Sequence, residues 1–222
     1  WREDRTRDPG SQFVYLRDVH NGEVWSATYQ PTARQPDRYL VEFLAEKATF
    51  ERLDHEITTR LDIAVSPGDD AEVRRISLTN HSDRPREIEL TSYVELGLGS
   101  IAEDVANPAF GKLFVETEWM ADSTALLARR RQRTPRDPAR VAFHVLAIQG
   151  PTQAQVEWET DRMRFLGRGR GPGDPKAMDG RALSGTTGAV LDPISALRTR
   201  LRLAPGGFAR VAFTTGVAAD EA

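Results

Sequence analysis

The sequence contains no cysteine among its 222 residues. It can therefore form no disulfide bond, and it offers neither a thiolate metal site nor a cysteine nucleophile. A chain without cysteine suits a reducing compartment, and on this ground we expect a cytoplasmic location. At this length about 70% of the surface of the unfolded chain can be buried on folding, so a hydrophobic core is sufficient without cross-links.

An excess of one charge and a long apolar run are also missing. Thirty Lys and Arg against 33 Asp and Glu give a formal net charge of −3, which lacks the basic excess of a general nucleic-acid binder. No stretch of about 18 apolar residues occurs, so we expect no membrane contact by this chain. A signal-peptide pattern is absent. Because the chain begins with Trp1, we expect residues 1–222 to form a single domain of a longer protein.

Motifs for catalysis or metal binding are scarce. The four histidines have none of the short spacings of a metal site, and we interpret them as turn and surface residues; they are His20, His55, His81 and His144. The adjacent carboxylates Glu103 and Asp104 would point to opposite faces of a strand. Asp69-Asp70 we place in a solvated turn. The sequence therefore predicts no catalytic residue and no metal.

Two arginine-rich segments resemble anion sites only superficially. Gly167-Arg168-Gly169-Arg170-Gly171 lacks the Gly-Lys-Ser/Thr end and the following helix of a phosphate loop. We expect its glycines to let the backbone turn sharply or approach a neighbouring surface. Residues 129–139 form a basic loop that we interpret as an exposed face. We do not expect nucleotide binding, but the arginines of 167–171 could donate to a sugar or a phosphate. Binding of nucleic acid or phosphate is the other interpretation of the basic loop.

The sequence does contain a clear two-residue alternation of apolar and polar side chains, which is typical of half-buried strands. It runs through 57–65, 76–78 and 88–98, with short polar turns between, and we interpret these runs as an antiparallel meander. Asn21-Gly22 predicts a hairpin between 13–18 and 24–29. Pro205-Gly206-Gly207 predicts a second hairpin between the alternating runs on either side of it, 197–203 and 211–217.

Many short strands with closely spaced turns favour an all-β sandwich or barrel with few short helices. Helices are predicted only near 100–106 and 192–196. The stretch 160–190 is irregular, and we expect it to be functional or to pack on a partner. Weaker strands are predicted at 38–44, 48–54, 113–119, 124–129, 140–148 and 153–158.

Aromatic side chains could serve as platforms for a sugar. For most of them packing in the core is the favoured interpretation, and for Trp25, beside the predicted hairpin, both roles stay open. The candidates are Trp1, Trp25, Tyr29, Tyr93, Phe110, Trp119 and Trp158.

Several segments, spread over nearly the whole chain, match a known pattern. They are Tyr15-Leu16-Arg17-Asp18, Gly22-Glu23-Val24-Trp25-Ser26, Tyr29-Gln30-Pro31, 69–80, 86–95, 107–115 and 160–170. Together they resemble the start of the inverting glycoside phosphorylases, which include cellobiose, chitobiose and 1,2-β-oligoglucan phosphorylases. The resemblance is closer still to the phosphorylase-like part of cyclic β-1,2-glucan synthases. The most specific matches are 104–115 and 160–170.

The resemblance implies a large antiparallel two-sheet β-sandwich, a supersandwich similar to galactose mutarotase. In the family a helical linker and an (α/α)6 barrel follow, and the barrel carries the general-acid aspartate and the phosphate site. That barrel is absent here, so the resemblance implies a domain without catalysis of its own and without a cofactor, whose parent would use inorganic phosphate. The implied partners are a β-glucan or oligosaccharide and the parent's catalytic barrel. A homodimer and an inner-membrane association of the parent stay open.

The resemblance also implies four substrate-binding residues, namely Phe110, Lys112, Asp161 and Arg168. The segment Ala109-Phe110-Gly111-Lys112 would supply a basic residue near the sugar. Cellobiose phosphorylases have arginine where this chain has Lys112, and the two are not interchangeable at a bidentate site; the lysine resembles the β-1,2-glucan branch. A plain strand residue is the other interpretation of Lys112. The second candidate segment is the loop from Asp161 to Arg170.

Two other functions stay open at this point. A stand-alone carbohydrate-binding module would expose aromatic side chains on one sheet face. A mutarotase-like enzyme would bring a histidine and a carboxylate together in a cleft.

Overall fold

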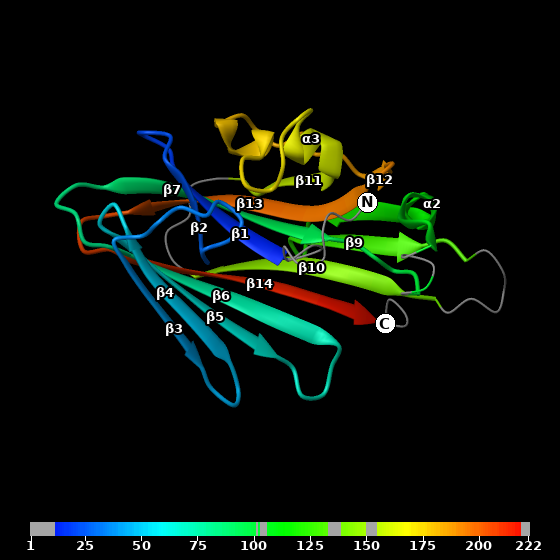
Figure 1. Ribbon diagram of the computed structural model, residues 1–222, viewed down its shortest axis with the longest axis horizontal. Coiled ribbons are helices and arrows are strands. Elements are labelled where there is room, and N and C mark those ends of the chain that lie inside the picture. The colour runs from blue at the N-terminus through cyan, green and yellow to red at the C-terminus, as the bar shows by residue number, and fades with distance from the viewer. Residues whose placement is uncertain (1–11, 101, 103–105, 133–138, 150–154, 219–222) are drawn as a thin grey trace.

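The computed structural model describes residues 12–100, 102, 106–132, 139–149 and 155–218. Two antiparallel sheets lie one on the other (Figure 1), which confirms the all-β sandwich. The smaller sheet has the order β11-β13-β7-β1-β2. Its strands are β1 (Gln12–Asp18), β2 (Val24–Ser26), β7 (Arg86–Glu95), β11 (Glu157–Asp161) and β13 (Pro193–Leu203).

The larger sheet has nine strands in the order β12-β8-β9-β10-β14-β6-β5-β4-β3. Each of the weaker strands predicted from the sequence has a counterpart here or in β11; residues 153–154, at the start of the predicted strand 153–158, lie outside the described residues. The strands are β3 (Arg38–Phe43), β4 (Ala48–Asp54), β5 (Ile57–Val65), β6 (Ala71–Asn80), β8 (Val115–Met120), β9 (Ala125–Arg130), β10 (Val141–Gln149), β12 (Gly188–Ala189) and β14 (Phe208–Ala218).

The predicted N-terminal hairpin is confirmed. β1 and β2 pair with Tyr15 opposite Ser26, and the turn contains Gly22 at a φ of 75°. Glycine adopts this left-handed conformation without the steric cost of a side chain. The Gly22 amide donates to the Asp18 carbonyl at 2.9 Å, which closes the turn.

Two predicted pairings are wrong, although their strands exist. β5 and β6 pair as expected, but β7 crosses to the smaller sheet, where it lies between β1 and β13. The predicted C-terminal hairpin is also absent, because β13 lies in the smaller sheet and β14 in the larger one. Alternation identifies the buried face of a strand but not its hydrogen-bonding neighbour. A turn between two strands can therefore join the two layers.

The turn at 204–207 is held by a buried amide. The Asn80 side chain donates to the carbonyls of Leu203 at 3.3 Å and Ala204 at 3.0 Å, and its backbone amide donates to the Gly207 carbonyl at 3.0 Å. These bonds satisfy backbone groups that would otherwise find a partner in a hairpin ladder. The arch between the sheets is thus stabilised from β6.

The sequence predicted helices near 100–106 and 192–196, and the structure tests only the second. The one near 192–196 is wrong, because β13 begins at Pro193 and pairs Ile194 with Glu95 of β7. Ile194 and Ala196 alternate on one buried face, and this two-residue period overrides the short helical pattern. The helix near 100–106 falls mostly outside the described residues. No helix in the described part is long and apolar enough to cross a membrane.

The main core fills the space between the sheets and settles the role of most aromatics. Trp25 is buried there. The rings of Trp119 and Trp158 stack at 4.3 Å and pack against the same core. Tyr93 is buried in a second cluster on the outer face of the smaller sheet, whereas Tyr29 is partly exposed. Core packing is confirmed for Trp25, Trp119, Trp158 and Tyr93 but not for Tyr29; Trp1 lies outside the described residues.

The histidine prediction is wrong at one position. His20, His55 and His81 are exposed, as expected, and so are Asp69 and Asp70 in their turn. Glu103-Asp104 lies outside the described residues. His144 is instead buried between the sheets on β10, where the hydroxyls of Ser92 and Thr215 lie 2.8 Å from its two ring nitrogens. Two hydroxyl partners satisfy the ring in an apolar surrounding.

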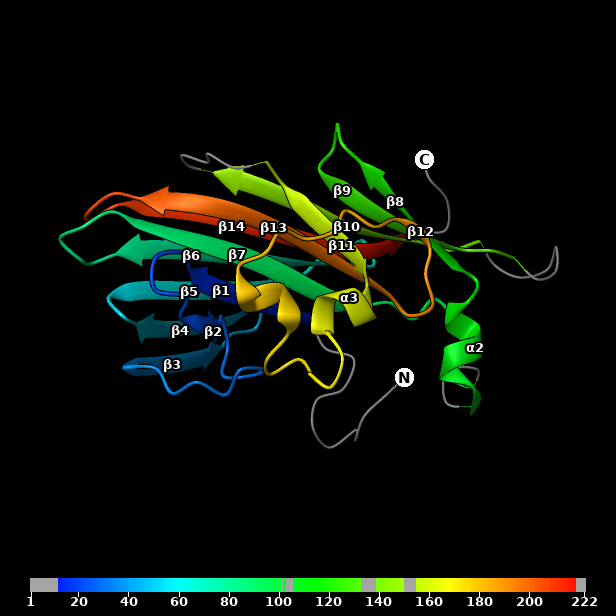
Figure 2. The same cartoon turned by 90° about the horizontal axis from the view of Figure 1, so that it is seen from above.

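The irregular stretch packs on the chain's own smaller sheet. We name residues 162–187 the cover segment; it contains α3 (Arg162–Leu166) and the 3-10 turn η2 (Lys176–Asp179). Figure 2 shows it lying across β7 and β13. Phe165, Leu166 and Met178 pack on Tyr15 and Tyr93 of the sheet. The stretch thus makes an internal contact, and the expectation that it is functional or packs on a partner stays a prediction.

Candidate functional site

The first predicted sugar-binding segment forms a short helix, α2 (Pro108–Lys112). Asn107 caps it, because its side-chain oxygen accepts a hydrogen bond from the Phe110 amide at 3.2 Å. Lys112 at the other end turns inward and is only 7% exposed. Its ammonium is ion-paired with Asp192, just before β13. The plain strand interpretation of Lys112 is wrong, since it ends a helix.

The second predicted segment begins at α3. The Asp161 carboxylate caps this helix by accepting from the amides of Met163 at 2.8 Å and Arg164 at 3.3 Å. Asp161 is therefore committed to local structure. The next residue, Arg162, points inward and is buried.

Arg162 and Lys112 meet at the same carboxylate. Arg162 lies 3.6 Å from Asp192 through one nitrogen, and its Nε donates to Glu95 and to the Tyr93 hydroxyl, each at 3.1 Å. Tyr93 in turn donates to Glu95 at 2.8 Å. We call Lys112, Asp192, Arg162, Glu95 and Tyr93 the corner network. Two cations and two carboxylates balance in it, so its burial leaves no net charge unpaired.

The electrostatics keep Tyr93 and Arg162 each in one protonation state. Burial raises the pKa of the Tyr93 phenol well above its ordinary value, and the Glu95 carboxylate adds to this rise. Burial alone would lower the pKa of Arg162, but Tyr93 and Glu95 outweigh it and raise that pKa. The phenol thus stays neutral and the guanidinium stays charged. The ion pairs of the network join α2, α3 and β7.

Several exposed apolar side chains lie close in sequence to members of the network. Phe110 is 45% exposed and contacts Phe114 edge to face, with ring centres 5.2 Å apart. Leu113 just after α2, Met163 on α3 and Leu191 beside Asp192 are also exposed. An exposed group of this kind on a folded domain is typical of a contact or ligand surface. We call Phe110, Leu113, Met163 and Leu191 the apolar rim.

The structure thus brings Lys112 to the start of α3, close to Asp161, and it leaves Phe110 exposed beside them. Arg168 is exposed beyond the end of α3 and is not a member of the corner network. The expected sharp turn at the glycines is present, because Gly167 and Gly169 have φ values of 84° and 74°. A Cβ on Gly167 would lie 2.8 Å from the Cβ of Lys176, so the expected close approach is present as well.

Sequence reasoning missed three members of the corner network. Glu95 and Arg162 lie within the matched segments 86–95 and 160–170, but nothing in their spacing marks them. Asp192 stands alone before Pro193 and carries no signal at all. Only the fold brings it to Lys112, 80 positions away in the sequence.

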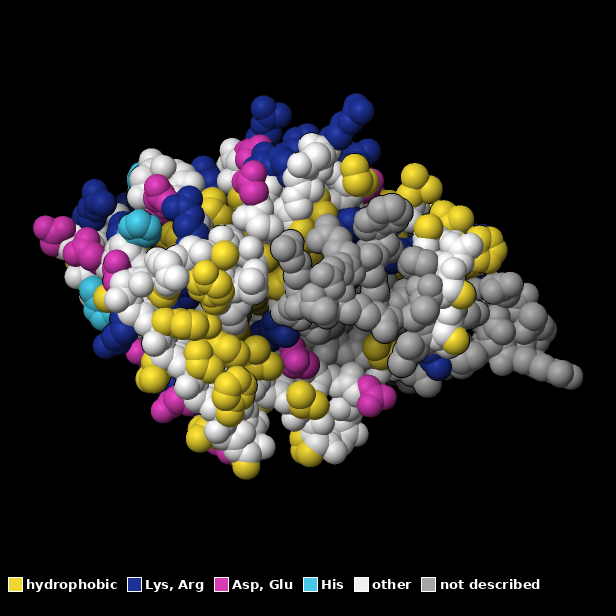
Figure 3. Space-filling view, viewed as in Figure 1, with side chains coloured by type: hydrophobic (Ala, Val, Ile, Leu, Met, Phe, Trp, Pro, Cys, Tyr) yellow, Lys and Arg dark blue, Asp and Glu magenta, His cyan; other side chains and the backbone are white. Residues whose placement is uncertain are grey.

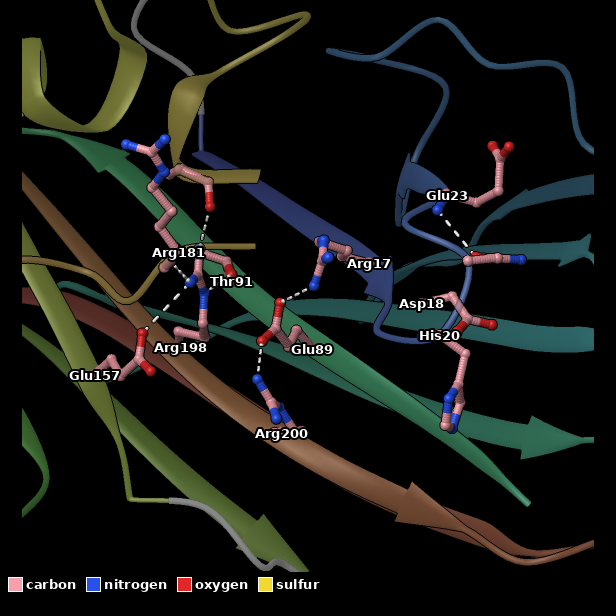
Figure 4. A network of polar contacts seen from close by, with 12 residues as sticks. Arg17, Asp18, His20, Glu23, Glu89, Thr91, Glu157, Arg181, Arg198 and Arg200 are labelled. Carbon is pink, nitrogen blue, oxygen red and sulfur yellow. Dashed lines mark hydrogen bonds and ion pairs between the residues drawn. The ribbon is translucent and has the colours of Figure 1, made fainter. Parts of the chain in front are cut away.

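A second polar group lies under the cover segment (Figure 4). Glu89 accepts from Arg17 at 3.0 Å and from Arg200 at 2.6 Å. Burial alone would raise the pKa of Glu89, but these two bonds and the charge of Arg198 hold it below its ordinary value. Arg198 donates to Thr91 at 2.9 Å and to the Arg181 carbonyl at 2.8 Å. Each of these charges has a partner. Because Arg198 of the sheet donates to the Arg181 carbonyl, the group also links the cover segment to the sheet.

The next question is whether the side chains of the described residues could hold a metal ion. Within the described ranges, no three His, Asp or Glu side chains converge in a way that could hold a metal ion. The carboxylates of the corner network are each engaged by a cation.

Comparison with known proteins matches residues 1–222 to the family model described as glycosyl hydrolase 94, supersandwich domain. The chain is 35% identical over 222 residues to the cyclic beta-(1,2)-glucan synthase NdvB of Rhizobium meliloti, covering 100% of this chain and 8% of that protein. It is 27% identical over 219 residues to the N,N'-diacetylchitobiose phosphorylase of Vibrio furnissii, covering 98% and 26%.

Among solved structures, a polysaccharide lyase aligns with a TM-score of 0.50 and 14% identity, covering 94% of this chain and 26% of that one. At this identity the likeness concerns the fold alone. The chain spans 8% to 26% of the length of the two relatives described above. A match over its whole length, on a two-sheet sandwich of the expected kind, decides its family. The chain belongs to the supersandwich domains of glycosyl hydrolase family 94.

Proposed function

We propose that this chain is a non-catalytic, carbohydrate-associated domain of a glycoside phosphorylase or a cyclic β-1,2-glucan synthase. The observation that carries the proposal is the family match over residues 1–222. The names of the relatives supply the substrate class, and the higher identity to the glucan synthase favours a β-1,2-glucan. No cofactor is required by this domain, and the parent would use inorganic phosphate.

In this proposal the domain packs on the parent's (α/α)6 barrel and lines its sugar site. The apolar rim offers the contact surface, and Phe110 beside Lys112 offers an aromatic ring next to a cation. An ammonium has three donors, so Lys112 can bind Asp192 and still donate to a sugar hydroxyl. Asp161 supports the site by capping α3. Arg168 would reach the sugar from the loop that follows. The domain would work in the cytoplasm, with its parent associated with the inner membrane.

A stand-alone carbohydrate-binding module remains the second candidate. It is favoured by Tyr39 and Phe43, which are exposed on one face of β3. A mutarotase-like enzyme has less support, because His144 contacts hydroxyls rather than a carboxylate.

The test is calorimetric titration of the chain with sophorose, longer β-1,2-glucans and cellobiose. Binding of β-1,2-glucans that weakens in Phe110→Ala and Lys112→Ala, but not in Phe208→Ala, is the expected result. Phe208 is an exposed aromatic at the start of β14 and serves as the matched control. Circular dichroism checks that each variant folds, since Lys112→Ala leaves Asp192 without its lysine.

Two outcomes contradict the proposal. Turnover of any β-glucan by the pure chain excludes a non-catalytic role. Binding that survives both corner variants, but is lost in Tyr39→Ala, moves the site to β3 and supports a binding module instead.

A further inference from the structure

A hollow of about 560 Å³ lies at the end of the smaller sheet where β7 begins. Arg86 is the first residue of β7 and Glu95, in the corner network, is the last, so the hollow and the network occupy opposite ends of this strand. Figure 3 shows Lys, Arg and His side chains, among acidic ones, at the left end of the molecule, where Figure 1 places the turn between β6 and β7. Sites for small molecules typically enclose about 300–1,000 Å³.

Two buried residues of opposite charge, Arg86 and Asp18, line the hollow. Arg86 is only 2% exposed; its Nε donates to Asp18 and its Nη1 to the His55 carbonyl, each at 2.8 Å, and its Nη2 also donates to Asp18. A guanidinium has five N–H donors, so two of them have no acceptor within the described residues. Buried donors normally have an acceptor, and a ligand oxygen in the hollow would supply one.

Three exposed side chains line the same hollow without a partner. Arg84, Arg202 and the ring of His20 make no ion pair and no side-chain hydrogen bond in the part of the chain that the structure describes. Their backbone is held in place, since the Asn80 side chain donates to the Arg84 carbonyl and the His20 amide donates to Asp18, each at 2.8 Å. A backbone that is already ordered loses little entropy when a ligand binds.

The charges around the hollow do not balance. Asp18 is engaged by Arg86, and the other acidic lining residue is Glu87. Glu87 lies opposite Arg202 in the register of β7 and β13 but forms no ion pair with it. Three arginines therefore face two carboxylates, whereas cations and carboxylates are equal in number in the corner network. Guanidinium groups in excess around a hollow are typical of an anion site, because each presents paired N–H donors to the oxygens of a phosphate or carboxylate.

We propose that the hollow binds a phosphate group carried by a small hydroxylated molecule, such as a sugar phosphate. Arg84, Arg202 and the unpartnered N–H groups of Arg86 donate to the phosphate oxygens, and the negative charge of the ligand offsets the excess of arginine. A phosphate monoester presents three acceptor oxygens, which suits donors that come from a turn, a strand start and a strand end. The hollow is larger than the ion alone, and Glu87 and Asn21 offer polar groups to the hydroxyls of the remainder.

The first test is calorimetric titration of the chain with glucose 6-phosphate, inorganic phosphate and glucose at millimolar concentration. We expect glucose 6-phosphate to bind more tightly than inorganic phosphate, because the ester also reaches Glu87 and Asn21. We expect no binding of glucose alone in the hollow, because it lacks the charge. A folded chain that binds neither phosphate compound overturns the proposal. Equal affinity for the two phosphates overturns the hydroxylated part of the ligand and assigns the hollow to the free ion.

The second test locates the site. Arg84→Gln and Arg202→Gln should each weaken the binding of glucose 6-phosphate roughly tenfold, because each removes a pair of charge-assisted hydrogen bonds. Arg75→Gln is the matched control, since it removes the same charge from an exposed arginine of β6 in the larger sheet, and it should leave the affinity unchanged. Binding that survives both variants at the hollow overturns the proposal. An equal loss in Arg75→Gln also overturns it, because net charge alone would then attract the anion.

Amide chemical shifts separate this site from the sugar site. Glucose 6-phosphate should shift the amides of 18–22 and 84–87 and leave those of 108–113 unchanged. Shifts confined to 108–113 would place the anion at the corner network and overturn the proposal. The inference does not rest on the proposed function, so the titrations with β-1,2-glucans and with phosphates can fail independently.

Discussion

Charged side chains are buried on one side of this molecule, whereas aromatic side chains are exposed on another. Under the cover segment, Arg198 is only 3% exposed and Glu89 is equally buried. On β3, Phe43 and Tyr39 are exposed at the end of the larger sheet. Both regions follow the two-residue alternation of strands. What differs is whether another part of the chain lies over the face.

The difference shows that a side chain is buried here when another part of the chain lies over it, whether that side chain is charged or apolar. A buried charge is tolerated when each of its hydrogen-bonding groups has a partner. The cover segment supplies such partners, since Arg198 donates to the carbonyls of Ala177 and Arg181 at 2.5 and 2.8 Å. Within the described residues β3 pairs with β4 alone, and its side chains Leu40 and Phe43 remain exposed.

The largest expected effect comes from breaking the covered side. Arg198→Met removes the donor to two backbone carbonyls and leaves buried groups unpaired, and we expect the free energy of unfolding to fall by about 3–5 kcal/mol. Urea unfolding followed by circular dichroism measures this. Arg200→Met is the matched control, because Arg200 binds the same Glu89 from a more exposed position; it should cost about 1 kcal/mol or less. Equal losses in both variants would show that burial under the cover is irrelevant.

A smaller loss of stability is expected from a substitution within the cover segment. Gly167→Ala puts a Cβ at a φ of 84° and within 2.8 Å of Lys176, so we expect a loss of about 2–3 kcal/mol from backbone strain and overpacking. Gly169→Ala is the control, because it has a similar φ of 74° but open space around it, and about 1 kcal/mol is expected. Hydrogen exchange at η2 should rise only in Gly167→Ala. Equal losses of stability in Gly167→Ala and Gly169→Ala would show that the contact between residue 167 and Lys176 does not matter for stability.

The space between the two sheets is a third environment. The polar side chain buried there, His144, is uncharged in the folded chain. Burial lowers the pKa of His144 to about 3, and the charge of Arg74 adds to this. An unfolded histidine has a pKa near 6.5, so between these values only the unfolded chain binds the proton. Stability is therefore complete above pH 6.5 and falls as the pH is lowered, by about 2 kcal/mol at pH 5.

Urea unfolding between pH 5 and 7.5 measures this dependence. His144→Gln, which cannot titrate, should be less stable at neutral pH and should lose the slope. If the free energy of unfolding of His144→Gln falls with pH as steeply as that of the wild type, other groups cause the pH dependence.

The smallest expected effect is on the uncovered side. Phe43→Ala should change the free energy of unfolding by about 0.5 kcal/mol or less, since an exposed side chain loses little on truncation. Phe165→Ala, in the covered cluster, should cost about 3–5 kcal/mol. Comparable losses for the two phenylalanines would contradict the contrast between the two regions.

Local patterns predicted most of the strands and the N-terminal hairpin. Asn21-Gly22 specifies a turn by its own backbone preference, and the period of two marks β5, β6 and β7 without any knowledge of their neighbours. The pairing of β7 and the arch between β13 and β14 could not be predicted, because a strand carries the same alternation whichever sheet it joins. His144 was misjudged for a related reason, since its two hydroxyl partners come from β7 and β14.

The sequence by itself determined the fold class, through periodicity, and the family, through matches such as 104–115 and 160–170. Only the tertiary structure decided that Asp192 neutralises Lys112, that the stretch after Asp161 covers its own sheet and that β3 ends the larger sheet. The physical reason is the same in each case. Alternation and turn preferences act within a few residues, whereas ion pairs and layer coverage depend on which distant strands become neighbours.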